Sequence, residues 1–167
     1  MDFTIRPALP GEYEALGDLT VHVYLADGLL DYGEDDPYIP TLRDVAGRAA
    51  TSDVLVAVDG EQLLGGVTFA RYGTPQAQIA RPGEAEFRAL AVAHAGRGRG
   101  AGEALVRACV DRARAADCTG VALSTQHMMH SAHRIYERLG FVRTPDRDWN
   151  PLPDRDDLQL LSYVLTF

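Results

Sequence analysis

Apolar and polar residues alternate along several short stretches in the first half of the chain, the pattern of half-buried β-strands. Strands are predicted over residues 3–7, 54–58 and 62–71. Asp59-Gly60 separates the last two and is typical of a tight hairpin turn. Apolar residues recur at helical spacing over 12–25, and a second short helix is predicted over about 42–50. The pattern indicates an antiparallel sheet with helices packed against it.

The pattern changes after residue 86, where strands and helices alternate. Residues 86–92 and 121–123 are predicted strands, and a glycine-rich turn at 96–102 leads from the first into a helix over about 102–116. A helix carrying Ala132, Ile135, Tyr136 and Leu139 on one face ends at Gly140, and a strand-like tail covers 158–167. Without repeats or linkers, residues 1–167 are predicted to form one α/β domain.

Composition narrows the class of protein. Hydrophobic residues make up 46% and charged residues 24%, as in an ordinary soluble protein, and no apolar run is long enough to cross a bilayer. The first residues lack a signal-peptide pattern, and two cysteines make no disulfide framework, so we expect a cytoplasmic protein without membrane attachment. A net charge of −8 argues against nucleic-acid binding, which depends on neutralising phosphates.

The segment Arg97-Gly98-Arg99-Gly100-Ala101-Gly102 lies between a predicted strand and a predicted helix. The first amides of a helix lack internal partners and attract anions, and glycines let a phosphate approach the main chain. Arg97 and Arg99 add cationic donors. The segment therefore predicts a phosphate-binding loop, although a glycine-rich turn that binds nothing has the same appearance.

A dinucleotide-binding motif also matches this region, as Gly96-x-Gly98-x-x-Ala101. That motif expects the first strand of a parallel sheet and an acidic residue at the end of the next strand. At least three strands precede the loop here, and Val121-Ala122-Leu123-Ser124 ends without a carboxylate. The sequence context excludes the nicotinamide interpretation.

Three motifs in residues 86–141 resemble the GNAT acetyltransferase superfamily. Arg97-x-x-Gly100-x-Gly102 is similar to its Arg/Gln-x-x-Gly-x-Gly/Ala signature, and Leu90-Ala91-Val92 to its fourth strand. The segment from Ala132 to Phe141 is similar to its Ala-x-x-x-Tyr-x-x-x-Gly-Phe motif. The order and spacing of the motifs agree, whereas the N-terminal third matches only in the order of its elements.

The resemblance implies an α/β fold with a splayed, mostly antiparallel sheet of about six or seven strands and about four helices. It implies acetyl-CoA as the acyl donor. Leu90, Ala91 and Val92 would meet the pantetheine arm through main-chain groups. The loop residues Arg97, Gly98, Arg99, Gly100, Ala101 and Gly102 would hold the pyrophosphate. Dimers are common in this superfamily, so a homodimer fits the resemblance.

The resemblance also implies two catalytic residues. Tyr136 occupies the position of the general acid that protonates the departing thiolate, and Glu86 that of a base for the amine proton. From spacing alone, Tyr136 is equally consistent with a core tyrosine, and Glu86 with a solvated glutamate at a strand edge. The choice between these interpretations stays open at this point.

One position departs from the family pattern. Many relatives carry an asparagine that contacts the coenzyme seven residues before the tyrosine, whereas this chain has Met129. Three histidines lie nearby, His127, His130 and His133, but no Cys or carboxylate joins them at the spacing of a metal site. We therefore expect no metal, and the histidines are interpreted as surface or coenzyme-lining residues.

The acceptor is less defined. Residues 27–36 contain five carboxylates and no basic residue: Asp27, Asp31, Glu34, Asp35 and Asp36. They form either a solvated acidic loop or a surface that attracts cationic amines. The sequence thus predicts an N-acetyltransferase that acts on a primary amine of a small molecule or a peptide. The alternative is a non-catalytic module that senses acyl-CoA, which would need the loop but neither Tyr136 nor Glu86.

Overall fold

The computed structural model describes residues 2–151 and 159–167 and contains a seven-stranded sheet of order β1-β2-β3-β4-β5-β7-β6. The strands are β1 (Thr4–Pro7), β2 (Asp53–Asp59), β3 (Gln62–Arg71), β4 (Glu84–Val92), β5 (Gly120–Thr125), β6 (Val142–Arg143) and β7 (Leu161–Thr166). Only β4 and β5 pair in parallel among these strands. The mixed, mostly antiparallel sheet predicted from the sequence is confirmed.

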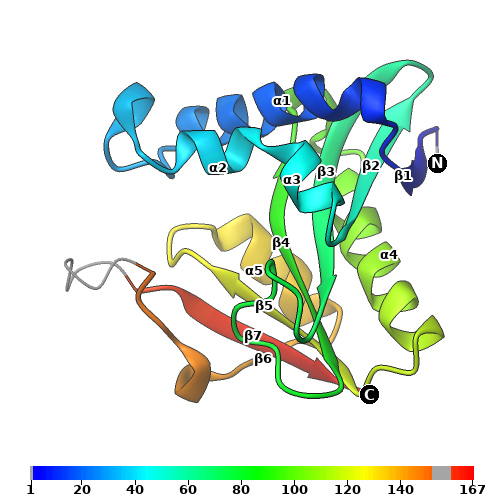
Figure 1. The fold of residues 1–167 in the computed structure, drawn as a ribbon, viewed down its shortest axis with the longest axis vertical. Coiled ribbons are helices and arrows are strands. Elements are labelled where there is room, and N and C mark those ends of the chain that lie inside the picture. The colour runs from blue at the N-terminus through cyan, green and yellow to red at the C-terminus, as the bar shows by residue number, and fades with distance from the viewer. Residues whose placement is uncertain (1, 152–158) are drawn as a thin grey trace.

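The described residues form five α-helices: α1 (Tyr13–Ala26), α2 (Ile39–Arg43), α3 (Val45–Ala49), α4 (Ala101–Ala115) and α5 (His130–Arg138). Figure 1 shows α1, α2 and α3 together on one side of the sheet and α4 on the other. Alternate residues of β2 face the two sides, as a strand requires. Leu55 packs in the core beneath α4, whereas Val56 packs with Leu16 of α1 and Val45 of α3.

The predicted helix over 42–50 is divided in two. The backbone of Asp44 leaves helical geometry (φ −82°, ψ 67°), and its carboxylate accepts the Gly47 amide at 3.0 Å. Asp44 therefore ends α2 and caps α3, since an aspartate at this position satisfies a free amide of the next turn. The two-residue strand β6 was not predicted, because it is too short to show an alternating pattern. Residue 158, the start of the predicted tail strand, lies outside the described residues.

The sheet opens between β4 and β5, and this opening positions the site. The two strands pair only from Glu84 to Phe87, opposite Gly120 to Leu123. Beyond Phe87, β4 carries a bulge, because two residues between Arg88 and Ala91 face a single residue of β3. Ala89 in the bulge has φ +56°, a conformation that L-residues rarely adopt. Past the last paired residues of β4 and β5, the group of strands β5 to β7 diverges from the group β2 to β4 (Figure 1).

Candidate active site

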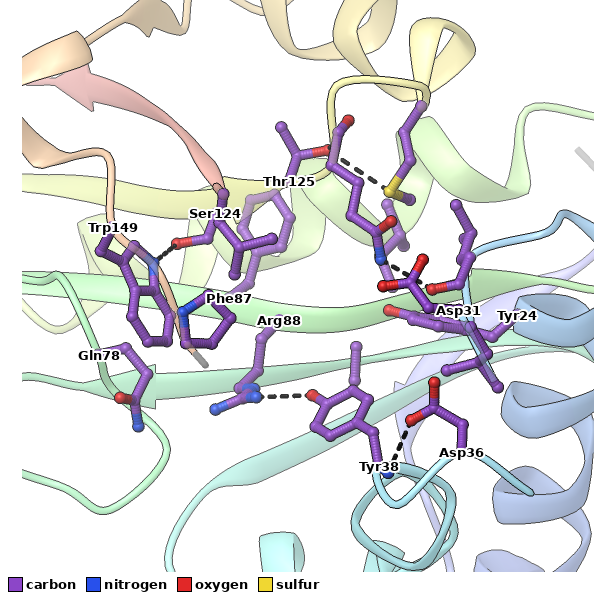
Figure 2. Close-up of a pocket in the computed structure, with 18 of the residues that line it drawn as sticks. Tyr24, Asp31, Asp36, Tyr38, Gln78, Phe87, Arg88, Ser124, Thr125 and Trp149 are labelled. Carbon is purple, nitrogen blue, oxygen red and sulfur yellow. Dashed lines mark hydrogen bonds between the residues drawn. The ribbon is translucent and has the colours of Figure 1, made fainter. Parts of the chain in front are cut away.

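Two cavities lie at the opening of the sheet. The loop cavity, about 700 Å³, is lined by the 96–102 loop, by residues 90–92 of β4 and by the start of α5. The aromatic cavity, about 360 Å³, is lined among others by Tyr38, Phe87, Tyr136 and Trp149 (Figure 2). Four residues line both cavities: Tyr24, Leu29, Leu90 and Met129. The two spaces therefore meet beside the β4 bulge.

The glycine loop presents free main-chain amides to the loop cavity. Gly98 and Gly100 have φ of +75° and +83°, and the turn they make leads into the first residue of α4, Ala101. No amide from Gly98 to Gly102 donates a hydrogen bond to another main-chain group within the described part of the chain. Free amides at a helix N-terminus suit a phosphate, so the loop fits the pyrophosphate of acetyl-CoA.

The two loop arginines point to different places. Arg97 lines the loop cavity, and its guanidinium donates to both carboxylate oxygens of Asp27 at 3.1 and 2.9 Å. Arg99 does not line either cavity, because its side chain pairs with Asp59 at 3.0 Å and with Asp2 at 3.1 Å. Apart from Arg99, every residue predicted to bind the coenzyme lines the loop cavity: Leu90, Ala91, Val92, Arg97, Gly98, Gly100, Ala101 and Gly102.

Tyr136 lies among aromatic side chains at the wall of the aromatic cavity. Its ring centroid is 5.8 Å from those of Phe87 and Tyr163, and 6.0 Å from that of Phe141. Burial raises the pKa of Tyr136 well above its ordinary value, so the phenol stays protonated at neutral pH. Within the described residues its hydroxyl makes no hydrogen bond to another side chain or to the main chain. Tyr136 is therefore a neutral phenol whose hydroxyl is not bound by another described residue.

Glu86 is buried, with only 2% of its surface exposed, which excludes a solvated glutamate at the strand edge. Its Oε1 accepts three consecutive amides, from Gln78, Ile79 and Ala80, at 2.8–2.9 Å. Burial raises the pKa of Glu86 above its ordinary value, although the three amides and the charge of Arg88 act in the opposite direction. Glu86 lines the aromatic cavity while it anchors the 78–80 segment.

The five carboxylates of residues 27–36 are not one patch. Asp27 pairs with Arg97 at the loop cavity, whereas Asp31 and Asp36 line the aromatic cavity. Asp36 accepts the amides of Tyr38 at 2.9 Å and Tyr32 at 3.3 Å, so it shapes the loop. Glu34 and Asp35 are exposed on a short 3-10 turn and line neither cavity.

Met129 stands where the two cavities meet, and its sulfur accepts the Thr125 hydroxyl at 3.5 Å. The imidazole of His133 contacts nearby residues, with Nε2 3.0 Å from the Gln126 carbonyl and 3.2 Å from the Thr125 hydroxyl. His130 lines the loop cavity and His127 is exposed. Residues 2–151 and 159–167 contain no cluster of three metal-ligating side chains, and none of their helices is both long and apolar enough for a membrane span.

Sequence reasoning missed several residues of the aromatic cavity. Arg88 is half-buried there, and its Nη2 donates to the hydroxyl of Tyr38 at 2.8 Å (Figure 2). The indole of Trp149, which also lines this cavity, donates to the Ser124 hydroxyl at 2.9 Å (Figure 2). The position of Arg88 could have been inferred from the sequence. It follows Glu86 by two residues on the same strand, so both side chains lie on one face of the sheet. Tyr38 and Trp149 reach the cavity from distant loops and carry no such signal.

A model described as the acetyltransferase (GNAT) family matches residues 20–141 of the sequence. The match covers the glycine loop, Glu86, Arg88 and Tyr136. No curated protein is significantly similar to the sequence.

Solved structures agree on the fold. The chain superposes on yncA from Salmonella typhimurium, solved with its cofactor acetyl-CoA, with a TM-score of 0.73, 18% identity, and coverage of 99% of this chain and 94% of that one. A GNAT-family acetyltransferase from Staphylococcus aureus gives a TM-score of 0.75 at 15% identity, covering 98% of both chains. A ribosomal-protein-alanine N-acetyltransferase from Brucella melitensis gives 0.73 at 17% identity, covering 98% and 99%. At these identities the likeness shows the fold.

Proposed function

Because this chain belongs to the acetyltransferase (GNAT) family, we propose that it transfers an acetyl group from acetyl-CoA to the nitrogen of a small primary amine. The observation that carries the proposal is the meeting of the two cavities beside the β4 bulge. Acetyl-CoA bound in the loop cavity would place its thioester at this junction. An amine bound in the aromatic cavity would place its nitrogen there as well. Such an arrangement supports direct transfer, without an acyl-enzyme intermediate.

Acetyl-CoA is the acyl donor. The free amides of Gly98 to Gly102 and the Arg97 guanidinium are suited to the pyrophosphate. Residues 90–92 of β4 have no strand partner on the side of β5, so their main-chain groups can pair with the pantetheine arm as a further strand would. A main-chain amide of the bulge is suited to polarise the thioester carbonyl, because a fixed donor stabilises the developing oxyanion.

The chemical step needs an uncharged amine. The amine nitrogen attacks the carbonyl carbon, the C–N bond forms and the C–S bond breaks. Glu86 takes the proton released from the nitrogen, directly or through water, since its raised pKa suits a base working near neutral pH. Tyr136, a buried neutral phenol that lines the aromatic cavity, supplies the proton that the departing thiolate takes up.

The size of the aromatic cavity favours a small molecule over a protein as acceptor. About 360 Å³ is at the lower end of the range for small-ligand sites. Its walls are mostly apolar and aromatic, with a few charged groups that can orient a ligand.

The proposal is tested by release of free thiol from acetyl-CoA in the presence of a panel of primary amines. At least one small amine is expected to give turnover, with the acetylated product identified by mass spectrometry. The chain contains no lysine, so its N-terminal amine is the only aliphatic amine that the enzyme itself adds to the assay. Binding of acetyl-CoA without thiol release from any amine would instead support the sensor alternative.

A further inference from the structure

Among the described residues, the guanidinium of Arg88 contacts only neutral oxygen atoms. Its Nη2 donates to the neutral hydroxyl of Tyr38 at 2.8 Å, and its Nη1 lies 3.5 Å from the Gln76 carbonyl. No carboxylate in the described part of the chain lies within ion-pair distance of it. A guanidinium carries five donors in a fixed fork, and the distances leave most of this fork available to a ligand.

Several other arginines of the protein pair with carboxylates. Arg97 pairs with Asp27, Arg143 with Asp148 and Arg147 with Glu84. Two carboxylates of the aromatic cavity, Asp36 and Glu86, are held by main-chain amides instead of by Arg88. In Figure 2, Asp31 and Asp36 lie with Tyr24 on one side of the cavity, while Arg88 extends toward Gln78 and Trp149 on the other. Asp31 and Asp36 therefore lie apart from Arg88 in this cavity.

A second guanidinium lies on the same face of the sheet. Arg48 is 5% exposed and donates to the Thr68 hydroxyl at 3.1 Å and to the carbonyls of Thr41 and Leu42. Thr68 is the residue of β3 directly opposite Arg88, so the two arginines are close neighbours. Burial lowers the pKa of Arg48, yet an arginine side chain keeps its charge in proteins. Arg48 also makes no ion pair with a carboxylate of the described residues, and it adds positive potential behind Arg88.

Arg88 is placed to orient the reacting amine. It follows Glu86 by two residues and immediately precedes the bulge at Ala89. Two residues of a strand span roughly 7 Å, so a molecule a few bonds long can reach from one side chain to the other. An anionic group on the Arg88 fork places a nearby amine between Glu86 and the bulge. A half-buried guanidinium with donors left over is a favourable partner for an anionic group of a ligand.

We propose that the acceptor is a primary amine that also carries a carboxylate, as an amino acid does, and that Arg88 binds this carboxylate. The inference rests on the proposed function and names the substrate class for the same site. The carboxylate lies in the fork of Arg88 and completes its hydrogen bonds. The amine faces Glu86, which takes its proton. In this proposal Arg88 determines which amine is accepted, whereas Glu86 and Tyr136 carry out the proton transfers of the reaction.

The test compares matched acceptors: each amino acid, its carboxamide, and the amine that lacks the carboxyl group. The best free amino acid is expected to exceed its two neutral counterparts by about tenfold or more in kcat/KM, because a desolvated guanidinium left unpaired is unfavourable. Arg88→Ala should lower kcat/KM for the free acid to the level of the carboxamide. The same variant should lower the rate with the carboxamide much less than the rate with the free acid, so the ratio between the two substrates approaches one.

Controls separate this inference from folding and from the proposed function. Arg71→Ala removes an exposed arginine at the end of β3 and should leave the ratio as in the parent. Arg88→Lys keeps the charge without the fork and should retain part of the preference. Equal loss with the free acid and the carboxamide, or faster reaction of polyamines and decarboxylated amines in the parent, overturns the role of Arg88. Absence of thiol release with every amine instead overturns the proposed function.

Discussion

Asp27, directly after α1, holds the guanidinium of Arg97 through two hydrogen bonds of 3.1 and 2.9 Å across 70 residues of sequence. The pair lies at the wall of the loop cavity. Both side chains are more than a third exposed, so the pair itself contributes little to stability. If Arg97 binds a phosphate of acetyl-CoA as proposed, the Asp27 carboxylate competes with that phosphate for the donors of the guanidinium.

Removing each loop arginine separately should distinguish their roles. Arg97→Ala is expected to weaken acetyl-CoA binding by about three- to tenfold, because a charged donor to phosphate is lost. Arg99→Ala is the matched control and should leave the affinity unchanged, since its side chain pairs with Asp59 and Asp2 away from the cavity. Asp27→Asn should strengthen binding, because it frees Arg97 and removes a negative charge. Calorimetric titration of each variant with acetyl-CoA measures all three effects.

A bulky residue in the glycine loop should block the donor. Acetyl-CoA should raise the melting temperature of the parent, because a ligand that binds the folded state alone stabilises it. Gly100→Trp should abolish this increase. Gly60→Trp in the β2–β3 hairpin is the control, since both glycines have positive φ and open space where a Cβ would stand. The two variants should lose similar stability, and an unchanged response in Gly100→Trp contradicts phosphate binding by the loop.

Tyr136→Phe tests the proton donor. The hydroxyl makes no hydrogen bond with the described residues, so its removal should change stability and acetyl-CoA affinity little. Turnover should fall by about one to three orders of magnitude, as expected for losing a general acid. Tyr163→Phe is the comparison variant, because Tyr163 packs against Tyr136 but does not line the aromatic cavity. Parent-like turnover in a folded Tyr136→Phe enzyme makes Tyr136 a packing residue.

Glu86→Gln should separate catalysis from anchoring. The amide oxygen can still accept the amides of residues 78–80, whereas the proton acceptor is lost, so kcat/KM should fall by about two to four orders of magnitude. In the parent, kcat/KM should rise with pH through the raised pKa of Glu86, and this dependence should disappear in the variant. Glu86→Ala also removes the anchor and should cost about 1–3 kcal/mol of stability.

The same raised pKa has a defined effect on stability. In the pH window between the unfolded value of about 4.5 and the higher folded value, the folded state binds more protons than the unfolded state. Stability contributed by this group is therefore full below the window and decreases as pH rises through it. Glu86→Gln removes this dependence and should be as stable as the parent, or more stable, at pH 7. Chemical denaturation of both proteins at pH 5 and pH 7 measures the difference.

Glu34 and Asp35 should have little influence on the reaction. They are exposed and line neither cavity, and exposed charges act through water over about one Debye length. The double variant Glu34→Gln, Asp35→Asn should change KM by less than about twofold at both low and high salt. A KM that rises for cationic amines only at low salt indicates instead that the acidic loop attracts the acceptor.

Much of the fold follows from the sequence, because its signals are local. The bounds predicted for β3, residues 62–71, agree with the structure, and Asp59-Gly60 marks its hairpin. The expected end of α5 is confirmed by the Phe141 amide, which donates to the Tyr136 carbonyl at 2.9 Å after Gly140. The family was identified from three motifs whose spacing within 86–141 depends on elements close in sequence. These features depend on backbone propensity and on the spacing of apolar side chains, and both can be recognised within a single short segment of sequence.

The site was decided by tertiary structure. Arg97 and Arg99 are two residues apart, yet one lines the loop cavity and the other pairs with Asp59, because side chains in an irregular loop follow no period. The sequence left open whether Glu86 is a catalytic base or a solvated residue at a strand edge, and its burial depends on contacts with the 78–80 segment. The fork of Arg88 meets Tyr38 across 50 residues, a contact that no local pattern encodes. The sequence by itself determined the elements and the family, whereas contacts between distant segments determined which side chains are buried, paired or available to a ligand.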